Sequence, residues 1–225
     1  MNLPKRACRR GGIAPTGLWG RIALLWRRFG SMHMSDRLVE IAQRYDREAR
    51  KCARAGAWLA ATVMQASALE AGLQAMCFLY PVEVKRTRVF AKKRFRGKRA
   101  KALELGLEQL IELASEAGWI PAQRFRWAGK RATIGQFCHE LRKVRNRVHP
   151  GRWARDRPVP LKFSKGVYAV IEEIFDAARS WLLHRVKRDL QRAMEREQRK
   201  AALQHKAAQR HAGARLAAAA APGVT

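Results

Sequence analysis

Four polar residues whose side chains could act together on one ligand lie late in the chain. Arg142, Arg145, Asn146 and His149 fall within eight consecutive positions. On a helical wheel they span an arc of about 100°, because each residue turns an α-helix by about 100°. The arc adjoins the apolar side of the same segment rather than opposing it. We therefore expect these four side chains to converge at the edge of a buried face.

His149 has the position of a residue that exchanges protons near neutral pH. Pro150 and Gly151 follow it and cannot extend the helix, so the histidine is expected in the last turn. The negative end of a helix favours protonated histidine and moves its pKa toward neutrality, where a general acid or base is useful. An alternative is that Arg and His side chains at this end only satisfy free backbone carbonyls.

The element that must position these residues is a helix beginning after Thr133, a residue type that caps helix N-termini. Its apolar residues project within an arc of about 80°, which predicts a face packed on the core. These residues are Ile134, Phe137, Leu141, Val144 and Val148.

The run from Leu141 to Gly151, LRKVRNRVHPG, resembles the signature of the HEPN superfamily of helical-bundle proteins. Many members are metal-independent RNases of toxin–antitoxin and antiphage systems, marked by an arginine, four to six residues, and a histidine. Six residues separate Arg142 from His149, which fits this pattern. Arg145-Asn146 resembles the family's common Arg-Asn pair, but only three residues separate Arg145 from His149. The resemblance covers about residues 36–186.

The resemblance implies a role for each of these residues. His149 would take the proton from a ribose 2′-hydroxyl or protonate the leaving oxygen. Arg142, with Arg145, would hold the phosphate and stabilise its growing charge, and Asn146 would orient them. It also implies a homodimer with two facing motifs, RNA as ligand and an antitoxin protein as a further partner. Several branches of the superfamily bind RNA without cutting it, which is the alternative.

No cofactor or metal is expected. The sequence contains no carboxylate pair or His/Cys cluster with metal-ligand spacing, and Cys138 and His139 are adjacent but point at different angles. The four cysteines are scattered without a C-x-x-C motif, which gives no reason to expect zinc or disulfides. A reducing, cytoplasmic location fits this usage best.

A basic segment precedes these elements. Ten of the seventeen residues from Lys85 to Lys101 are Lys or Arg, and none is acidic. We interpret it as a flexible arm that neutralises phosphates while Phe90 and Phe95 stack on bases, the alternative being a solvated loop. The residues expected to bind nucleic acid are Lys85, Arg86, Arg88, Lys92, Lys93, Arg94, Arg96, Lys98 and Arg99.

The charge of the whole chain also indicates a polyanionic partner. Its 225 residues include 47 Lys or Arg and 18 Asp or Glu, so the formal net charge is +29. A nearby polyanion would relieve the resulting self-repulsion. Codon bias in a GC-rich gene is the alternative explanation for the many Ala and Arg residues. An apolar content of 48% excludes wholesale disorder.

The middle of the chain has helical periodicity throughout. From Asp36 to Tyr80 there is no proline, and we expect two long helices or one helix bent at Gly56. Residues 57–79 are predicted to form a central core helix in which a buried Glu70 needs a cationic partner, such as an arginine. Leu103 to Ala114 should form another helix, with Gly118 as its C-cap, and Trp119, Ile120, Phe125 and Trp127 should cover the core from a loop.

The last long helix is expected from about Ser164 to Leu190. Its predicted apolar face comprises Val167, Val170, Ile171, Ile174, Phe175, Trp181, Leu182 and Val186. Acids Glu172, Glu173 and Asp176 could pair with arginines of the preceding helix or form a solvated face.

We therefore expect an all-α fold, a single bundle of about five long helices with flexible basic termini. Residues 1–34 are a basic leader, with Ser35-Asp36 as an N-cap pair; 35–187 form the HEPN-like bundle; and 188–225 form an Ala/Arg-rich tail that is helical and then disordered. The apolar run at 17–26 is short and contains Arg21, so no stable membrane insertion is expected, although the leader could lie on a membrane surface.

The predicted function is that of a HEPN-like RNA-binding protein, with metal-independent endoribonuclease activity in a toxin–antitoxin or antiphage system as the catalytic hypothesis. The alternative is a non-catalytic basic helical module that binds nucleic acid or a ribonucleoprotein.

Overall fold

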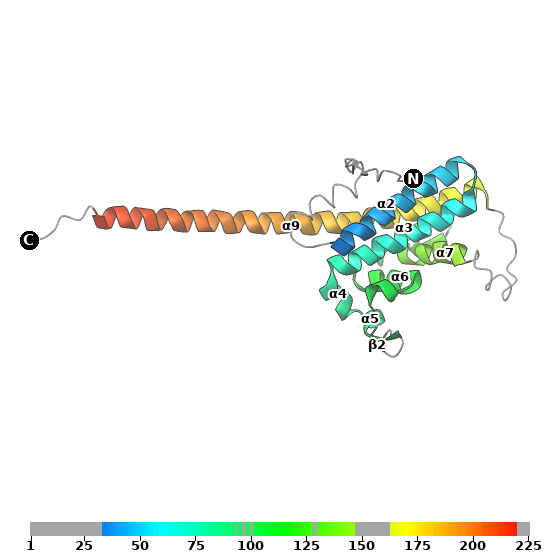
Figure 1. The fold of residues 1–225 in the computed structure, drawn as a ribbon, viewed down its shortest axis with the longest axis horizontal. Coiled ribbons are helices and arrows are strands. Elements are labelled where there is room, and N and C mark those ends of the chain that lie inside the picture. The colour runs from blue at the N-terminus through cyan, green and yellow to red at the C-terminus, as the bar shows by residue number, and fades with distance from the viewer. Residues whose placement is uncertain are drawn as a thin grey trace, which may run out of the picture. The chain divides into compact units, whose positions relative to one another are not determined.

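The computed structural model describes residues 33–92, 94–95, 98–99, 101–127, 130–146 and 163–219. Over these ranges the protein is mainly helical, which confirms the all-α prediction, and α2, α3, α6, α7 and α9 are its five long helices (Figure 1). The helices are α2 (His33–Arg54), α3 (Trp58–Leu79), α4 (Pro81–Arg86), α5 (Arg88–Lys92), the short 3₁₀ helix η2 (Ala102–Glu104), α6 (Leu107–Glu116), α7 (Ile134–Asn146) and α9 (Lys165–Ala219).

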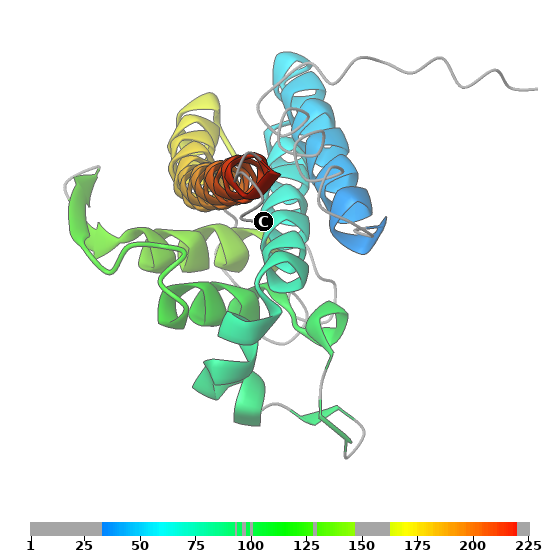
Figure 2. The same ribbon diagram turned by 90° about the vertical axis from the view of Figure 1, so that its left-hand side faces the viewer.

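The chain divides into two compact units, one that ends at Leu183 and one that runs from His184, so the boundary falls inside α9. In the first unit, α2 and α3 form an antiparallel pair (Figures 1 and 2). Gly56 makes the turn between them with φ of +73°, a left-handed conformation that favours glycine. The amides of Gly56 and Ala57 donate to the carbonyls of Ala53 and Cys52, which closes the end of α2.

Helix α3 is the central element of the first unit, as the sequence predicts. It contacts α2, α6 and α7 and buries residues on several sides, because small side chains let its neighbours approach closely. These small residues include Ala61, Ala68, Gly72 and Ala75.

Helix α6 ends at Glu116 with Ala117 as its C-cap, one residue before the predicted Gly118, which follows with φ of +68°. The amides of Gly118 and Trp119 donate to the carbonyls of Ser115 and Ala114, the pattern of a Schellman motif. Trp119 and Ile120 then cover the core. The prediction for Leu103 was wrong: it belongs to η2 and is 46% exposed.

Two short antiparallel hairpins interrupt the helices, and neither was predicted. Strand β3 (Arg124–Trp127) pairs with β4 (Lys130–Thr133), in a segment expected to be a loop. Strand β1 (Arg94–Phe95) pairs with β2 (Lys98–Arg99). For residues 85–92 the expectation of a flexible arm or loop was also wrong, because α4 ends at Arg86 and α5 covers Arg88–Lys92, with one extended residue, Thr87, between them.

Helix α9 begins where predicted, since the Ser164 hydroxyl accepts a hydrogen bond from the Val167 amide at 3.3 Å. Ile171, Ile174, Phe175 and Leu182 are buried, whereas Val170 and Trp181 are each 39% exposed, so the predicted apolar face was too broad. The helix continues to Ala219, well beyond Leu190.

At the other end, α2 begins at His33, so Ser35 and Asp36 lie inside its first turn and are not the predicted N-cap pair. The predictions for residues 1–32 and for the extreme C-terminus lie outside the described residues. Within the described ranges, none of the helices combines the length and the apolar character that a transmembrane segment requires.

Candidate functional site

Helix α7, which carries three of the four candidate catalytic residues, is fixed at its start by a reciprocal cap. The Gln136 amide donates to Thr133 Oγ1 at 3.1 Å, and the Thr133 amide donates to Gln136 Oε1 at 2.9 Å. Ile134, Phe137 and Leu141 are buried and face the core as predicted. Val144 is half-buried, and Val148 lies outside the described residues.

Arg142 joins α7 to α6. Its Nη1 lies 2.6 Å from Glu108 Oε2, and the Arg142 side chain is only 15% exposed. Arg142 Nε is buried and has no hydrogen-bond partner among the described residues. The guanidinium is therefore held by the Glu108 carboxylate, whose own side chain is 46% exposed.

Arg145 joins α7 to α3. Its Nη2 donates to Glu70 Oε2 at 3.0 Å, and both side chains are mostly buried. This contact confirms the prediction that Glu70 needs an arginine partner. The two arginines thus contact carboxylates on two different helices, and the structure does not bring them to one shared partner.

Asn146 is half-buried and is the last residue of α7. His149 lies outside the described residues, so its distance from Arg142 stays untested, as do the roles that the HEPN resemblance implies for these residues.

His139 is a titratable residue of α7 to which the sequence analysis assigned no role. Burial is the main cause that lowers its pKa below the usual value, and the nearby Arg142 guanidinium lowers it further, while Glu112 and Glu108 act in the opposite direction. The signal in the sequence is that His139 and Arg142 are three residues apart on one helix.

The candidate nucleic-acid-binding residues begin on α4 and α5. Lys85, Arg86, Arg88 and Lys92 are all exposed, and we call these four residues the α4–α5 face. Arg94 follows in β1, and Lys98 and Arg99 in β2. Lys93 and Arg96 lie outside the described residues.

The two short helices are anchored from the opposite side. Val84 is buried, and the indole Nε1 of Trp119 donates to Glu83 Oε2 at 2.6 Å, which ties α4 to the end of α6. Glu116 Oε2 of α6 accepts from the backbone amides of Arg88 and Val89, at 2.7 and 3.4 Å. The Glu116 carboxylate, at the surface of α6, therefore caps α5 and stabilises its position.

A surface cavity of about 430 Å³ lies beside this anchor and is lined by Arg86, Arg88, Glu83 and Glu116 among others. Arg88 Nε is 3.5 Å from Glu116 Oε1, yet the Arg88 side chain is 82% exposed. Because it is so exposed, the ion pair between Arg88 and Glu116 is weak, and the Arg88 guanidinium stays accessible to a ligand.

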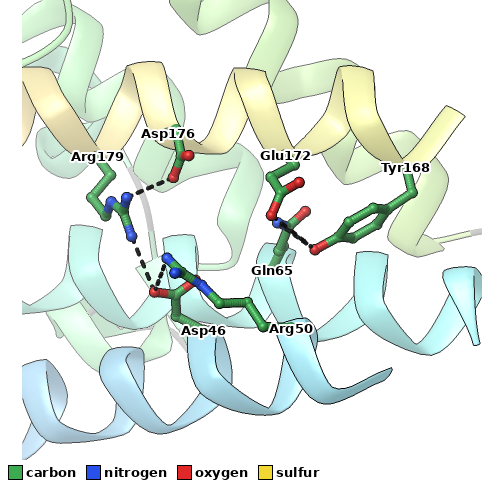
Figure 3. Close-up of polar contacts among 7 residues, drawn as sticks. All are labelled: Asp46, Arg50, Gln65, Tyr168, Glu172, Asp176 and Arg179. Carbon is green, nitrogen blue, oxygen red and sulfur yellow. Dashed lines mark hydrogen bonds and ion pairs between the residues drawn. The ribbon is translucent and has the colours of Figure 1, made fainter. Parts of the chain in front are cut away.

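A polar cluster between α2, α3 and α9 was missed by the sequence analysis (Figure 3). Asp46, 14% exposed, accepts from Arg50 at 3.1 Å and from Arg179 at 3.0 Å, and Arg179 also contacts Asp176 at 2.7 Å. The sequence shows the spacings of Asp46 with Arg50 and of Asp176 with Arg179. The contact between Arg179 and Asp46 depends on how distant helices pack.

The same cluster contains Gln65, whose Nε2 donates to the Tyr168 hydroxyl at 3.1 Å; that hydroxyl donates to Glu172 at 3.4 Å (Figure 3). Burial and the adjacent Glu172 raise the pKa of Tyr168 to about 12, so the phenol stays protonated. Glu172 and Asp176 thus contact residues of their own helix rather than the predicted arginines of α7. The cluster joins helices and offers no poised general base.

The described part of the chain contains no group of three or more His, Cys, Asp or Glu residues that could hold a metal ion. Burial raises the pKa of both Cys77 and Cys138 to about 12, which keeps these thiols protonated and unreactive. Comparisons with protein-family models, with curated proteins and with solved structures find no match to this chain.

Proposed function

We propose that this protein binds RNA through the α4–α5 face, as a basic helical module that does not require catalysis. The observation that carries the proposal is a set of exposed cations on an anchored support. Lys85, Arg86 and Lys92 make no ion pair with any carboxylate in the described ranges. Such cations can neutralise phosphates and release counterions.

The charge balance of the two candidate regions favours the α4–α5 face over α7 as the phosphate-binding surface. Arg142 and Arg145 are each paired with a carboxylate and largely buried, so a phosphate would have to displace Glu108 or Glu70. On the α4–α5 face a phosphate has no buried ion pair to break. RNA cleavage by Arg142 and His149 stays a hypothesis.

The anchoring of α4 and α5 matters because it limits the conformational entropy lost when RNA binds. A loose arm must be ordered when it meets RNA, whereas α5 is already fixed by Glu116 and by Thr87, whose hydroxyl accepts from the Phe90 amide at 3.4 Å. Phe90 is half-buried in the same short helix.

The test is RNA binding by a variant in which Lys85, Arg86 and Lys92 are changed to Gln. A fluorescent 20-nucleotide oligouridine is titrated by anisotropy in EDTA at several salt concentrations. Removing three phosphate contacts should make the plot of log association constant against log salt less steep, reducing the magnitude of its negative slope by about 2. Binding at 0.1 M salt should become about 100-fold weaker. The matched control changes Arg37, Arg44 and Arg47 to Gln, three exposed cations of α2.

The proposal requires the control to bind nearly as the parent does. Equal losses of affinity in the two variants would show that net charge alone governs binding and would overturn the proposal.

Gel analysis of the same RNA tests the catalytic hypothesis. Cleavage by the parent that disappears in His149→Ala would make the protein a nuclease, whereas intact RNA supports the binding module.

A further inference from the structure

The second unit carries a row of exposed cations along one side of α9. Five exposed residues, Arg188, Arg192, Arg196, Arg199 and Lys206, lie within an arc of about 80° when each residue turns the helix by about 100°. We call these five residues the α9 stripe. None of them belongs to the basic segment discussed above.

The stripe is long, and its first four residues follow one another every three or four positions, with Lys206 seven positions further on. Arg188 and Lys206 are eighteen positions apart, a rise of about 27 Å along a straight helix. The first steps, from Arg188 to Arg192 and on to Arg196, each rise about 6 Å. This spacing is close to that of neighbouring phosphates along one nucleic-acid strand.

The acids of this part of α9 leave the stripe largely uncompensated. Asp189 is held by Arg185 at 2.6 Å and lies only at the outer limit of contact, 4.0 Å, from Arg188 and Arg192. Glu195 accepts a hydrogen bond from Gln191 at 3.2 Å and lies about 20° outside the arc, so it and Asp189 offset only part of the five positive charges. Glu197 is on the opposite side of the helix from Arg188.

We propose that the α9 stripe is a second RNA-contacting element, and that it binds the backbone of a single strand. The identity of the ligand rests on the proposed RNA-binding function, but the residues are separate. A helix lying in a duplex groove meets phosphates of both strands on its two flanks. Five of the seven exposed Lys and Arg residues between positions 187 and 206 share one narrow arc, which suits one strand laid along the helix, and a flexible single strand can follow it.

The composition of the helix argues against a lipid surface as the ligand. A membrane-surface helix needs an apolar face separate from its charged face. Here the exposed Leu203 lies within the arc of the stripe, and the exposed Met194 is on the other side, so no continuous apolar face forms.

The experiment uses the full chain with Arg192, Arg196 and Arg199 changed to Gln. Gln keeps the helix propensity close to that of Arg, so circular dichroism should be unchanged. The control changes Lys165, Lys187 and Lys200 to Gln, three exposed cations of α9 that lie outside the stripe. Binding is measured with oligouridine, with an RNA duplex of equal length and with phosphatidylglycerol vesicles.

We expect the stripe variant to bind oligouridine about 100-fold more weakly than the parent at 0.1 M salt, with the difference closing toward 1 M. The control variant should bind oligouridine with an affinity close to that of the parent. The stripe variant should lose less affinity for the RNA duplex than for the single strand. Unchanged oligouridine binding by the stripe variant, equal losses in the control, or a loss confined to duplex or vesicles would each overturn the inference.

The variant of the α4–α5 face, titrated in parallel, separates this inference from the proposed function. If that variant alone loses affinity, the stripe has no role and the proposed function stands. If the stripe variant alone loses affinity, the proposed site is wrong and the stripe is the RNA-binding element.

Discussion

Arg145 and Glu70 show how much one pair of residues could be predicted from the sequence. A single acid in the long apolar segment of α3 required a cation, and its partner proved to be an arginine of α7, 75 positions along the chain. The sequence did not identify which arginine, because the distance between two helices depends on packing at every intervening contact. Arg142, three residues earlier, contacts Glu108 instead.

Replacing Arg145 by Met should leave the Glu70 carboxylate without its partner. We expect unfolding in urea to show a loss of about 1–2 kcal/mol, since a hydrogen bond to a charged group contributes on that order. The double variant with Glu70→Gln should recover part of this loss, because the unpaired charge is then gone. A double variant no more stable than Arg145→Met would contradict this account.

His139 should make stability depend on pH. Its pKa in the folded state is lowered, mainly by burial, so the unfolded chain binds the proton more readily. The free energy of unfolding should therefore be highest above the unfolded pKa of about 6.5 and decrease as the pH falls below it. Urea unfolding of the parent and of His139→Gln between about pH 5.5 and 7.5 measures this, and the variant should have the flatter profile. Identical profiles would remove His139 as the cause.

Some helix ends could be predicted from local residue types, whereas the start of α2 and the end of α9 could not. Gly56, Gly118, Thr133 and Ser164 all act at the helix ends where their residue types belong, because capping depends on local conformation. The β3–β4 hairpin was missed although Arg124–Trp127 alternates polar and aromatic residues, since four residues give a weak strand signal. The anchoring of α5 by Glu116 was beyond sequence reasoning because it joins elements 28 residues apart.

Glu116→Ala should loosen α5 without unfolding α2 or α3. Loss of a carboxylate cap costs about 1 kcal/mol, and the amides of Arg88 and Val89 lose their acceptor. Hydrogen exchange at these two amides should therefore become faster than in the parent, while exchange in α3 stays unchanged. Glu112→Ala, on the exposed side of the same helix, is the control and should leave both amides as they are.

At the scale of the whole molecule, the net charge of +29 leads us to expect that repulsion between cations outweighs local attraction. With 47 basic and 18 acidic residues, most charge pairs are alike, and the salt bridges found here compensate only part of this excess. The sequence predicted the sign of the field correctly. The sequence did not predict which positive side chains lack a carboxylate partner, because this depends on which arginines form ion pairs in the folded protein.

The melting temperature should therefore rise when salt increases from about 20 to 200 mM, because screening weakens long-range repulsion more than close ion pairs. At low salt, oligouridine at 100 times its Kd should stabilise the fold by about 2.7 kcal/mol by mass action. Differential scanning fluorimetry measures both effects. A melting temperature that falls with added salt would mean that the ion pairs dominate.

The Glu116 cap also has a consequence for selectivity. Its carboxylate already accepts the two amides at the start of α5, so an incoming anion finds side-chain charge there and no backbone donors of fixed geometry. Lys85 and Lys92 act as point charges, and the exposed guanidinium groups of Arg86 and Arg88 can pair with many kinds of anionic group, so this surface should respond mainly to charge density. Heparin should consequently compete with RNA for this surface, and discrimination among natural polyanions would have to come from elsewhere along the chain.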